Sequence, residues 1–209
     1  MIRRQANYYI RISLGILLLV ISVLAFFNAF YYHSPSIIFW FCYLSVPLAG
    51  IGILTNNATL VKSQLYILAI PDLIWTIDFV YYLINGHSLL GIVDYLFAAE
   101  SILPKIVTMQ HMITIPIIFY SLVLLKNKEG SSWKISVCQL AIVYLLTRIF
   151  TAPEANINCA YNLCGHFSLN LGISYVVLWF AISFLMVYIS RKIFIKAHWL
   201  FRRLFNIIT

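Results

Sequence analysis

His111 is the residue of this sequence best suited to acid–base chemistry. It stands in the segment Met109-Gln110-His111-Met112-Ile113-Thr114-Ile115-Pro116, which is largely apolar and ends in a helix-bending proline. Burial and neighbouring carboxylates tune the protonation of an imidazole, which suits this side chain to the role of general base. A histidine in a membrane helix can equally serve as an interhelical hydrogen-bond donor, and the sequence leaves both interpretations open.

Three charged residues lie inside apolar stretches, where a charge is costly and usually faces a protein interior or a wet cavity. Asp72 follows Pro71, and a kink beside a carboxylate marks either a cavity or a packing device. Asp78 and Arg148 are the other two. An ion pair between Arg148 and either Asp78 or Glu154, holding helices in register, is the structural interpretation of these charges.

Other polar residues gather in two segments, one between the third and fourth apolar stretches and one between the fifth and sixth. Both segments lie on the same side of a membrane if the chain crosses it six times, so we expect one outward-opening polar site there. Asn156 and Asn158 either tie the second segment or contact a ligand. The inner half lacks comparable polar groups, and this absence, with the missing internal repeat, argues against a transporter. The residues of the two segments are His87, Asp94, Glu100, Lys105, Glu154, Asn156, Asn158 and His166.

Six apolar stretches must position these side chains, and each approaches the roughly 20 residues that a helix needs to cross about 30 Å of hydrocarbon. The sequence therefore predicts one all-α, polytopic membrane domain over residues 1–209. We also expect a short amphipathic or re-entrant segment between the third and fourth helices, and a basic amphipathic tail at 191–209. The stretches cover 12–31, 36–54, 64–84, 105–125, 134–152 and 172–190.

Composition and charge agree with a membrane domain. The chain is 63% apolar and 10% charged, whereas a soluble domain carries about 25% charged residues. With the N-terminus inside and six crossings, twelve of the fourteen Lys and Arg fall on the inner side, which predicts an N-in/C-in topology. The net charge of +8 then reflects contact with anionic lipid headgroups, and we expect no nucleic-acid partner. In a bacterium, the residence would be the inner membrane.

Four cysteines are spread along the chain. Cys159 and Cys164 share the loop between the fifth and sixth stretches, where their separation allows a disulfide without requiring one. Cys42 and Cys138 lie inside apolar stretches, and burial as small apolar side chains is the simplest expectation for both.

The chain resembles the androgen-induced family of membrane hydrolases in topology and in a few motifs. The His-x-x-x-x-Pro of His111–Pro116 is similar to the fourth-span signature of that family. Fainter likenesses are Leu54-Thr55, Tyr144-Leu145-Leu146 and the loop Asn158-Cys159-Ala160-Tyr161-Asn162. The resemblance implies six helices and cleavage of fatty-acid esters of hydroxy fatty acids by a membrane-embedded threonine and a histidine. The segment 153–158 also resembles uncharacterised bacterial membrane proteins, a likeness that implies no activity.

This chain departs from the family at the nucleophile, because no threonine stands near the outer start of the second span. The nearest nucleophilic side chains are Ser36, Cys42 and Ser45. Related transmembrane acyltransferases use cysteine, so the resemblance implies Cys42, or Ser45, as nucleophile with His111 as base. In this hypothesis Arg148 or an amide such as Gln110 stabilises the oxyanion, and membrane lipids are the partners.

Two other functions remain open at this point. A metal-dependent hydrolase would bind zinc through His87, His111 and a carboxylate such as Asp72, Asp78 or Asp94, although the sequence contains no compact ligand motif. A protein without catalysis would bind a lipid or a small molecule in the same polar site. The hypothesis of an acyl hydrolase or acyltransferase with Cys42 or Ser45 as nucleophile needs no cofactor.

Overall fold

The computed structural model of the chain describes residues 2–32, 34–125, 130–167 and 171–204. Within these ranges the regular structure is entirely helical, which confirms the prediction of an all-α protein. The elements are α1 (Ile2–Tyr31), η1 (Pro35–Phe39), α2 (Phe41–Leu54), α3 (Ala58–Asn85), α4 (Asp94–Ala98), α5 (Ile102–Thr108), α6 (Gln110–Leu124), α7 (Ser132–Phe150), η2 (Pro153–Ala155), η3 (Ile157–Cys159) and α8 (Ser174–Leu204), where η denotes a 3₁₀ helix.

Five helical segments of the described chain are long and apolar enough to cross a membrane, as a multi-pass membrane protein requires. The expected second span forms α2, an apolar helix of 14 residues, shorter than the other five. The five long segments are Gln5–Tyr31, Ala58–Asn85, Ile102–Leu124, Ser132–Phe150 and Ser174–Ala197.

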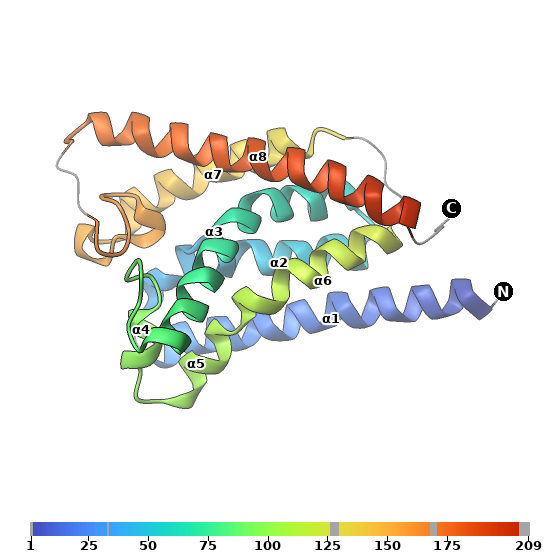
Figure 1. The fold of residues 1–209 in the computed structure, drawn as a ribbon, viewed down its shortest axis with the longest axis horizontal. Helices are drawn as coiled ribbons and strands as arrows, with labels where there is room; N and C mark the ends of the chain where they lie inside the picture. The colour runs from blue at the N-terminus through green and yellow to red at the C-terminus, as the bar shows by residue number, and fades with distance from the viewer. Residues whose placement is uncertain (1, 33, 126–129, 168–170, 205–209) are drawn as a thin grey trace.

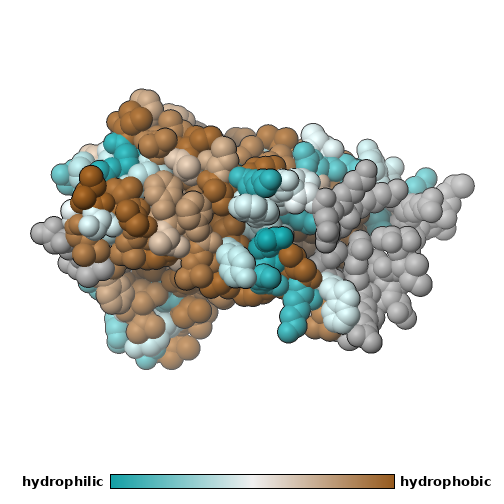
Figure 2. Space-filling model, turned by 90° about the horizontal axis from the view of Figure 1, so that it is seen from above, coloured by the Kyte–Doolittle hydropathy of each residue, from teal (hydrophilic) through white to brown (hydrophobic). Residues whose placement is uncertain are grey.

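The helices run roughly parallel or antiparallel to the long axis, and both chain termini lie at the same end (Figure 1). We call this end, with the turn at residues 55–57, the terminal end. The opposite end, with η1, α4 and the segment 152–166, is called the loop end. On the face seen in Figure 2, hydrophobic residues dominate between the loop end and the middle of the molecule, and hydrophilic residues lie at the loop end and from the middle toward the terminal end. A continuous hydrophobic surface of this kind suits contact with a bilayer.

Small residues bring α1 and α2 close together. A Cβ atom added at Gly15 would lie 2.8 Å from the Leu54 side chain, and one at Gly50 would lie 3.1 Å from the Gly15 carbonyl oxygen. Such close approach favours helix association in lipid, where apolar burial alone gives little driving force. Arg11 strengthens the pair because its guanidinium donates a hydrogen bond of 3.0 Å to the Ile53 carbonyl at the end of α2.

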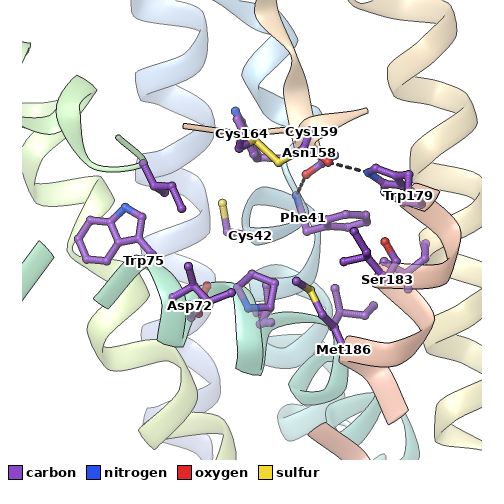
Figure 3. Close-up of a pocket in the computed structure, with 18 of the residues that line it drawn as sticks. Phe41, Cys42, Asp72, Trp75, Asn158, Cys159, Cys164, Trp179, Ser183 and Met186 are labelled. Atoms are coloured by element: carbon purple, nitrogen blue, oxygen red, sulfur yellow. Dashed lines mark hydrogen bonds between the residues drawn. A yellow bond between two sulfur atoms is a disulfide. The ribbon is translucent and has the colours of Figure 1, made fainter. Parts of the chain in front are cut away.

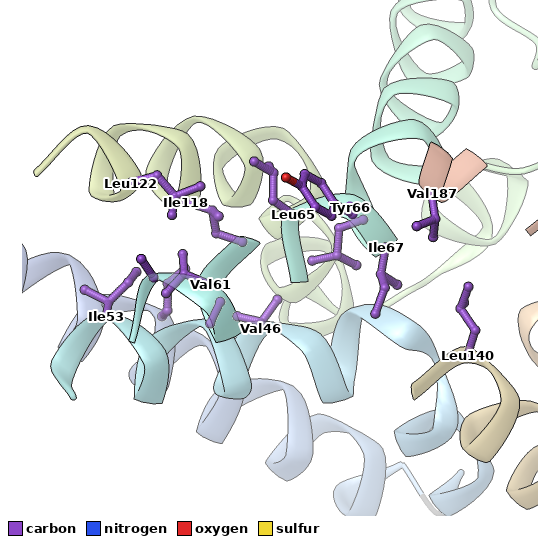
Figure 4. Packing of buried hydrophobic residues seen from close by; sticks show 14 of the residues in the cluster. Val46, Ile53, Val61, Leu65, Tyr66, Ile67, Ile118, Leu122, Leu140 and Val187 are labelled. Atoms are coloured by element: carbon purple, nitrogen blue, oxygen red, sulfur yellow. The ribbon is translucent and has the colours of Figure 1, made fainter. Parts of the chain in front are cut away.

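The core is centred on α3, which contacts α2, α6, α7 and α8. Figure 4 shows its packing, with Val61 and Leu65 of α3 between residues of α2 and α6. Asn57 begins α3 by accepting a hydrogen bond from the Leu60 amide, and Gly86 ends it in the left-handed conformation. The helix changes direction along its length (Figure 1), and Pro71 inside it removes one backbone hydrogen bond.

Two elements differ from the spans read from sequence. The expected fourth span is two helices, because α5 ends at Thr108 and α6 begins at Gln110. The basic tail expected at 191–209 is part of α8 as far as it is described, because this helix continues without a break to Leu204. Residues 205–209 lie outside the described chain. Between α3 and α5, the expected short helix is α4 at the loop end.

Candidate functional site

A cavity of about 440 Å³ lies among α2, α3, α6, α7 and α8 near the loop end (Figure 3). We call it the loop-end cavity. Its walls are mainly apolar and aromatic, and three residues of chemical interest open into it: Cys42, Asp72 and His111. The volume is within the range of about 300–1,000 Å³ typical of small-molecule sites. Aromatic walls come from Trp40, Phe41, Trp75, Tyr175 and Trp179.

Cys42 is a free cysteine in the first turn of α2. The helix begins there because the Asn158 side chain accepts a hydrogen bond of 2.9 Å from the Phe41 amide. In Figure 3 the thiol lies between Trp75 and Phe41, with Asp72 below it. The cavity around the thiol is mainly apolar, which disfavours a thiolate, so a reaction at this sulfur would need a base to take its proton.

His111 follows directly after the break between α5 and α6. Its Nδ1 lies 2.8 Å from the Thr108 carbonyl oxygen, which can only accept a hydrogen bond, so Nδ1 carries the proton. In the neutral ring Nε2 is then an acceptor, as a general base requires. The ring stacks on Trp75 with centroids 4.9 Å apart, and the Trp75 Nε1 donates to the Tyr95 hydroxyl at 3.1 Å. These contacts fix the orientation of the imidazole.

Asp72 lies on α3 directly after Pro71 and is only 4% exposed. Its carboxyl group faces the cavity and is close enough to the Cys42 thiol for an electrostatic interaction. Within the described residues, no protein group donates a hydrogen bond to this carboxyl. A buried carboxyl without a protein partner is costly, so a hydrogen-bonding group brought by a ligand would be favourable at this position.

Ser45 lies outside the cavity and takes part in a buried polar network. Its hydroxyl accepts a hydrogen bond of 3.1 Å from Gln139 of α7, whose side-chain oxygen accepts another of 2.9 Å from Gln64 of α3. Nearby, the Ser136 hydroxyl donates to the Ser63 carbonyl at 2.9 Å. Sequence analysis weighed ionisable residues and passed over amides, so it did not predict this uncharged network.

Asp78 also has a structural environment. Its two carboxylate oxygens accept four backbone hydrogen bonds, from the amides of Leu89, Leu90, Ile92 and Val93, at 2.7 to 3.2 Å. The side chain is fully buried, and bonds of this charge-assisted type are strong. Asp78 thus anchors the segment after α3 at the loop end and does not line the cavity.

Arg148 pairs with neither expected carboxylate. Its guanidinium donates to the Ala160 carbonyl at 3.3 Å and lies 4.3 Å from the centre of the Tyr161 ring. Asp78 is occupied by backbone amides, and Glu154 is exposed. Among the described residues, the ion pair expected from the sequence is not formed. Gln110, the other expected oxyanion donor, is buried outside the cavity.

The loop after α7 covers the cavity and is tied at several points. Cys159 and Cys164 form a disulfide on the cavity wall, which answers the question that the sequence left open. Asn156, in the left-handed conformation, accepts hydrogen bonds from the Tyr161 and Asn162 amides at 3.0 Å. Asn158 lines the cavity, donates to the Phe39 carbonyl at 2.7 Å, and accepts from Trp179 Nε1 at 2.9 Å through its own carbonyl.

Two loop-end segments interlock above the site. The His166 amide donates to the Leu90 carbonyl at 2.9 Å, and the His166 ring contacts the Ser88 hydroxyl at 3.4 Å. Gly165 leaves no room for a side chain, because a Cβ atom there would collide with the Leu90 carbonyl oxygen. The cover of the cavity is thus a joint structure built from two distant parts of the chain.

The remaining candidates lie apart from the cavity. Asp94, Glu100 and Glu154 are exposed at the loop end, and the His87 ring contacts the Asn85 carbonyl and the Tyr81 ring. Neither His87 nor Asp78 lines the cavity with His111, so these three side chains do not form the ligand set that the zinc hypothesis needs. The described residues contain no group of three His, Cys, Asp or Glu suited to a metal ion.

Compared with known proteins, the chain matches no family model, no curated protein and no solved structure at a significant level.

Proposed function

We propose that the chain spans a membrane six times, with the terminal end on the inner side. Five long apolar helices and the shorter α2 supply the crossings. Toward the terminal end lie Arg11, Lys62, Lys134 and Arg191, as the positive-inside rule requires of an inner face. The loop-end cavity would then open toward the outer side, as expected from the distribution of polar residues. In a bacterial cell this membrane would be the inner membrane.

We propose that the loop-end cavity is the active site of an intramembrane acyl hydrolase or acyltransferase. The observation that carries this proposal is that Cys42 of α2 and His111 of α6 open into one apolar cavity. A thiol and an imidazole are the minimum set for nucleophilic acyl transfer. The apolar walls favour an acyl chain over a polar substrate.

The reaction would proceed through a thioester on Cys42. His111 Nε2 takes the thiol proton, the Cys42 sulfur attacks the ester carbonyl, and the proton passes to the departing alkoxide, which leaves as an alcohol. Water or an acceptor alcohol then attacks the thioester and regenerates the thiol. The backbone N–H of Cys42 would donate to the oxyanion, since the Phe41, Tyr43 and Leu44 amides already donate hydrogen bonds and Arg148 and Gln110 lie elsewhere. Asp72 would bind a polar group of the substrate next to the ester.

Trapping of the acyl-enzyme tests this function. Purified protein in detergent would be incubated with medium- and long-chain fatty acyl esters, and its intact mass measured before and after neutral hydroxylamine, which releases thioesters. We expect one acyl group on the native chain and on the Cys138→Ser variant, whose thiol is exposed outside the cavity. We expect none on Cys42→Ala. Equal acylation of Cys42→Ala and the native protein would refute the proposal.

A second function has its own structural support. In the described chain, no hydrogen bond joins Cys42 to His111, and an apolar cavity needs neither residue to hold a lipid or a small apolar molecule. A non-catalytic binding protein would retain a ligand through purification and show no ester turnover. Mass spectrometry of extracted ligands from native and Cys42→Ala protein would distinguish this alternative, because binding without chemistry persists in the variant.

A further inference from the structure

A second cavity, of about 570 Å³, lies among α3, α6, α7 and α8 at the terminal end. We call it the terminal-end cavity. Lys62 of α3 and Arg191 of α8 both line it, although they are far apart in the sequence. Apolar side chains of α6 and α8, including Leu122 and Phe194, form another part of the wall. The cavity therefore combines a cationic part with an apolar part.

Two basic side chains, Lys62 of α3 and Arg191 of α8, bring positive charge to this cavity. Arg191 is also close enough to Tyr66, another wall residue, for an electrostatic interaction with its hydroxyl. Two cations on separate helices favour a bound anion.

The N-terminus of α7 supplies hydrogen-bond donors to the same cavity. Gly130, Ser131 and Ser132 line it, and α7 begins at Ser132, so the first N–H groups of the helix lack helical acceptors. Ser132 is 2% exposed, and its hydroxyl has no hydrogen-bond partner among the described residues. A buried hydroxyl without a partner indicates a missing polar ligand. Helix N-termini with such donors bind phosphate and other anions.

We propose that the terminal-end cavity binds the phosphate group of an anionic phospholipid. Lys62, Arg191 and the first turn of α7 would hold the phosphate, and the apolar wall at Leu122 and Phe194 would contact the adjoining lipid chains. Free phosphate carries the same negative charge but has no apolar part to contact that wall, so the cavity favours a lipid. Basic pockets between helices on the inner side of a membrane are suited to such headgroups. This proposal does not depend on the chemistry at Cys42.

Native mass spectrometry of the full chain in detergent can test the proposal. Dioleoyl phosphatidylglycerol would be titrated against dioleoyl phosphatidylcholine, for the native protein and for the Lys62→Gln/Arg191→Gln double variant. The matched control is Lys134→Gln/Lys192→Gln, which removes the same charge from exposed positions at the same end that do not line the cavity. We expect phosphatidylglycerol affinity to fall about tenfold or more in the first double variant. The control and phosphatidylcholine binding should stay within about twofold of native.

Two further arms identify the ligand and protect the test against misfolding. Ser132→Ala keeps both cations and removes one donor, so a few-fold loss of phosphatidylglycerol affinity is expected even if the double variant does not fold. Millimolar inorganic phosphate should not displace the lipid; displacement would assign free phosphate and overturn the lipid proposal. An equal loss in both double variants, or no loss at Ser132→Ala, would also overturn it. Cys42→Ala should bind as native, whatever its acyl-transfer activity.

Discussion

The loop-end and terminal-end cavities share walls from α3, α6, α7 and α8 but differ in the chemistry of their lining residues. At the loop end, α3 contributes Asp72 and Trp75 to a cavity that also holds a thiol and an imidazole. At the terminal end, the same helix contributes Lys62 and Tyr66 to a cavity with a second cation. The comparison shows that the same helices can line one cavity with a thiol, an imidazole and a carboxyl group and another cavity with two cations, because their side chains differ along their length.

The buried network of Ser45, Gln64 and Gln139 lies in the core beside both sites. Leu140, the neighbour of Gln139, lines the loop-end cavity, and Leu65, the neighbour of Gln64, lines the terminal-end cavity. The network joins α2, α3 and α7 through uncharged groups. We infer that it fixes the relative positions of these helices and thereby supports the shapes of both cavities.

The largest effect is expected for Cys42→Ala, which should abolish turnover at the loop-end cavity and leave binding at the terminal-end cavity unchanged. Removal of the nucleophile should reduce ester turnover by about a thousandfold or more, to background, while phosphatidylglycerol binding at the terminal end stays native. Turnover with a chromogenic acyl ester and native mass spectrometry would be measured on the same sample. Retained turnover would exclude a role for the loop-end thiol, and Cys138→Ser serves as the control.

His111→Gln should have the next largest effect. Loss of the general base is expected to slow acylation of Cys42 about 100-fold to 1,000-fold, while glutamine still reaches the Thr108 region without providing a base. The pH profile of turnover sharpens the test, because the native rate should fall as the imidazole is protonated and the variant should lose this dependence. Met112→Leu, at an exposed neighbouring position, is the matched control. An unchanged pH profile in His111→Gln would contradict the assignment.

Asp78→Ala tests the cover of the loop-end cavity. Four backbone amides would lose their acceptor, and we expect the free energy of unfolding to fall by about 3 kcal/mol. Unfolding in mixed detergent micelles, followed by tryptophan fluorescence, would measure this change. Asp94→Ala, at an exposed site of the same end, should change stability by about 0.5 kcal/mol or less. Equal effects of the two substitutions would mean that the amide contacts contribute little.

The smallest effect is expected for Gln139→Leu, which breaks the network beside both cavities. Hydrogen bonds between membrane helices contribute about 0.6 kcal/mol each, so the loss of two should lower stability by about 1 kcal/mol. Turnover and lipid binding should both decline slightly. Ser45→Ala removes only one of these bonds and should cost about half as much. A collapse of one activity alone would show that the network serves a single cavity.

Sequence reasoning predicted the features that depend on amino-acid composition over long stretches of the chain. The apolar helices follow from hydropathy, and the shared location of Asp72 and His111 follows from their similar depth in neighbouring spans. The resemblance to membrane hydrolases led to Cys42, which opens into the same cavity. No long-range contact was needed for these predictions, since each depends on where a residue lies along its own helix.

Features set by local geometry could not be obtained in the same way. Cys42 and Ser45 looked equivalent from the sequence, but Ser45 accepts a hydrogen bond from Gln139 and only Cys42 lines the cavity. Asp78 looked like a partner for Arg148, because sequence does not reveal that a loop eleven residues later folds back with its amides. Lys62 and Arg191 were counted as topology signals, and their shared cavity became apparent only in three dimensions.

The shortness of α2 sets the depth at which chemistry would occur. About 18 Å of helix separates Cys42 from Leu54 at 1.5 Å per residue. With Leu54 at the inner boundary of a hydrocarbon layer about 30 Å thick, the thiol lies roughly 12 Å beneath the outer boundary. A lipid ester would thus have to sink below its resting level, or the bilayer would have to thin around the protein. Cys42 should accordingly react faster with a maleimide that partitions into lipid than with a charged, water-soluble one.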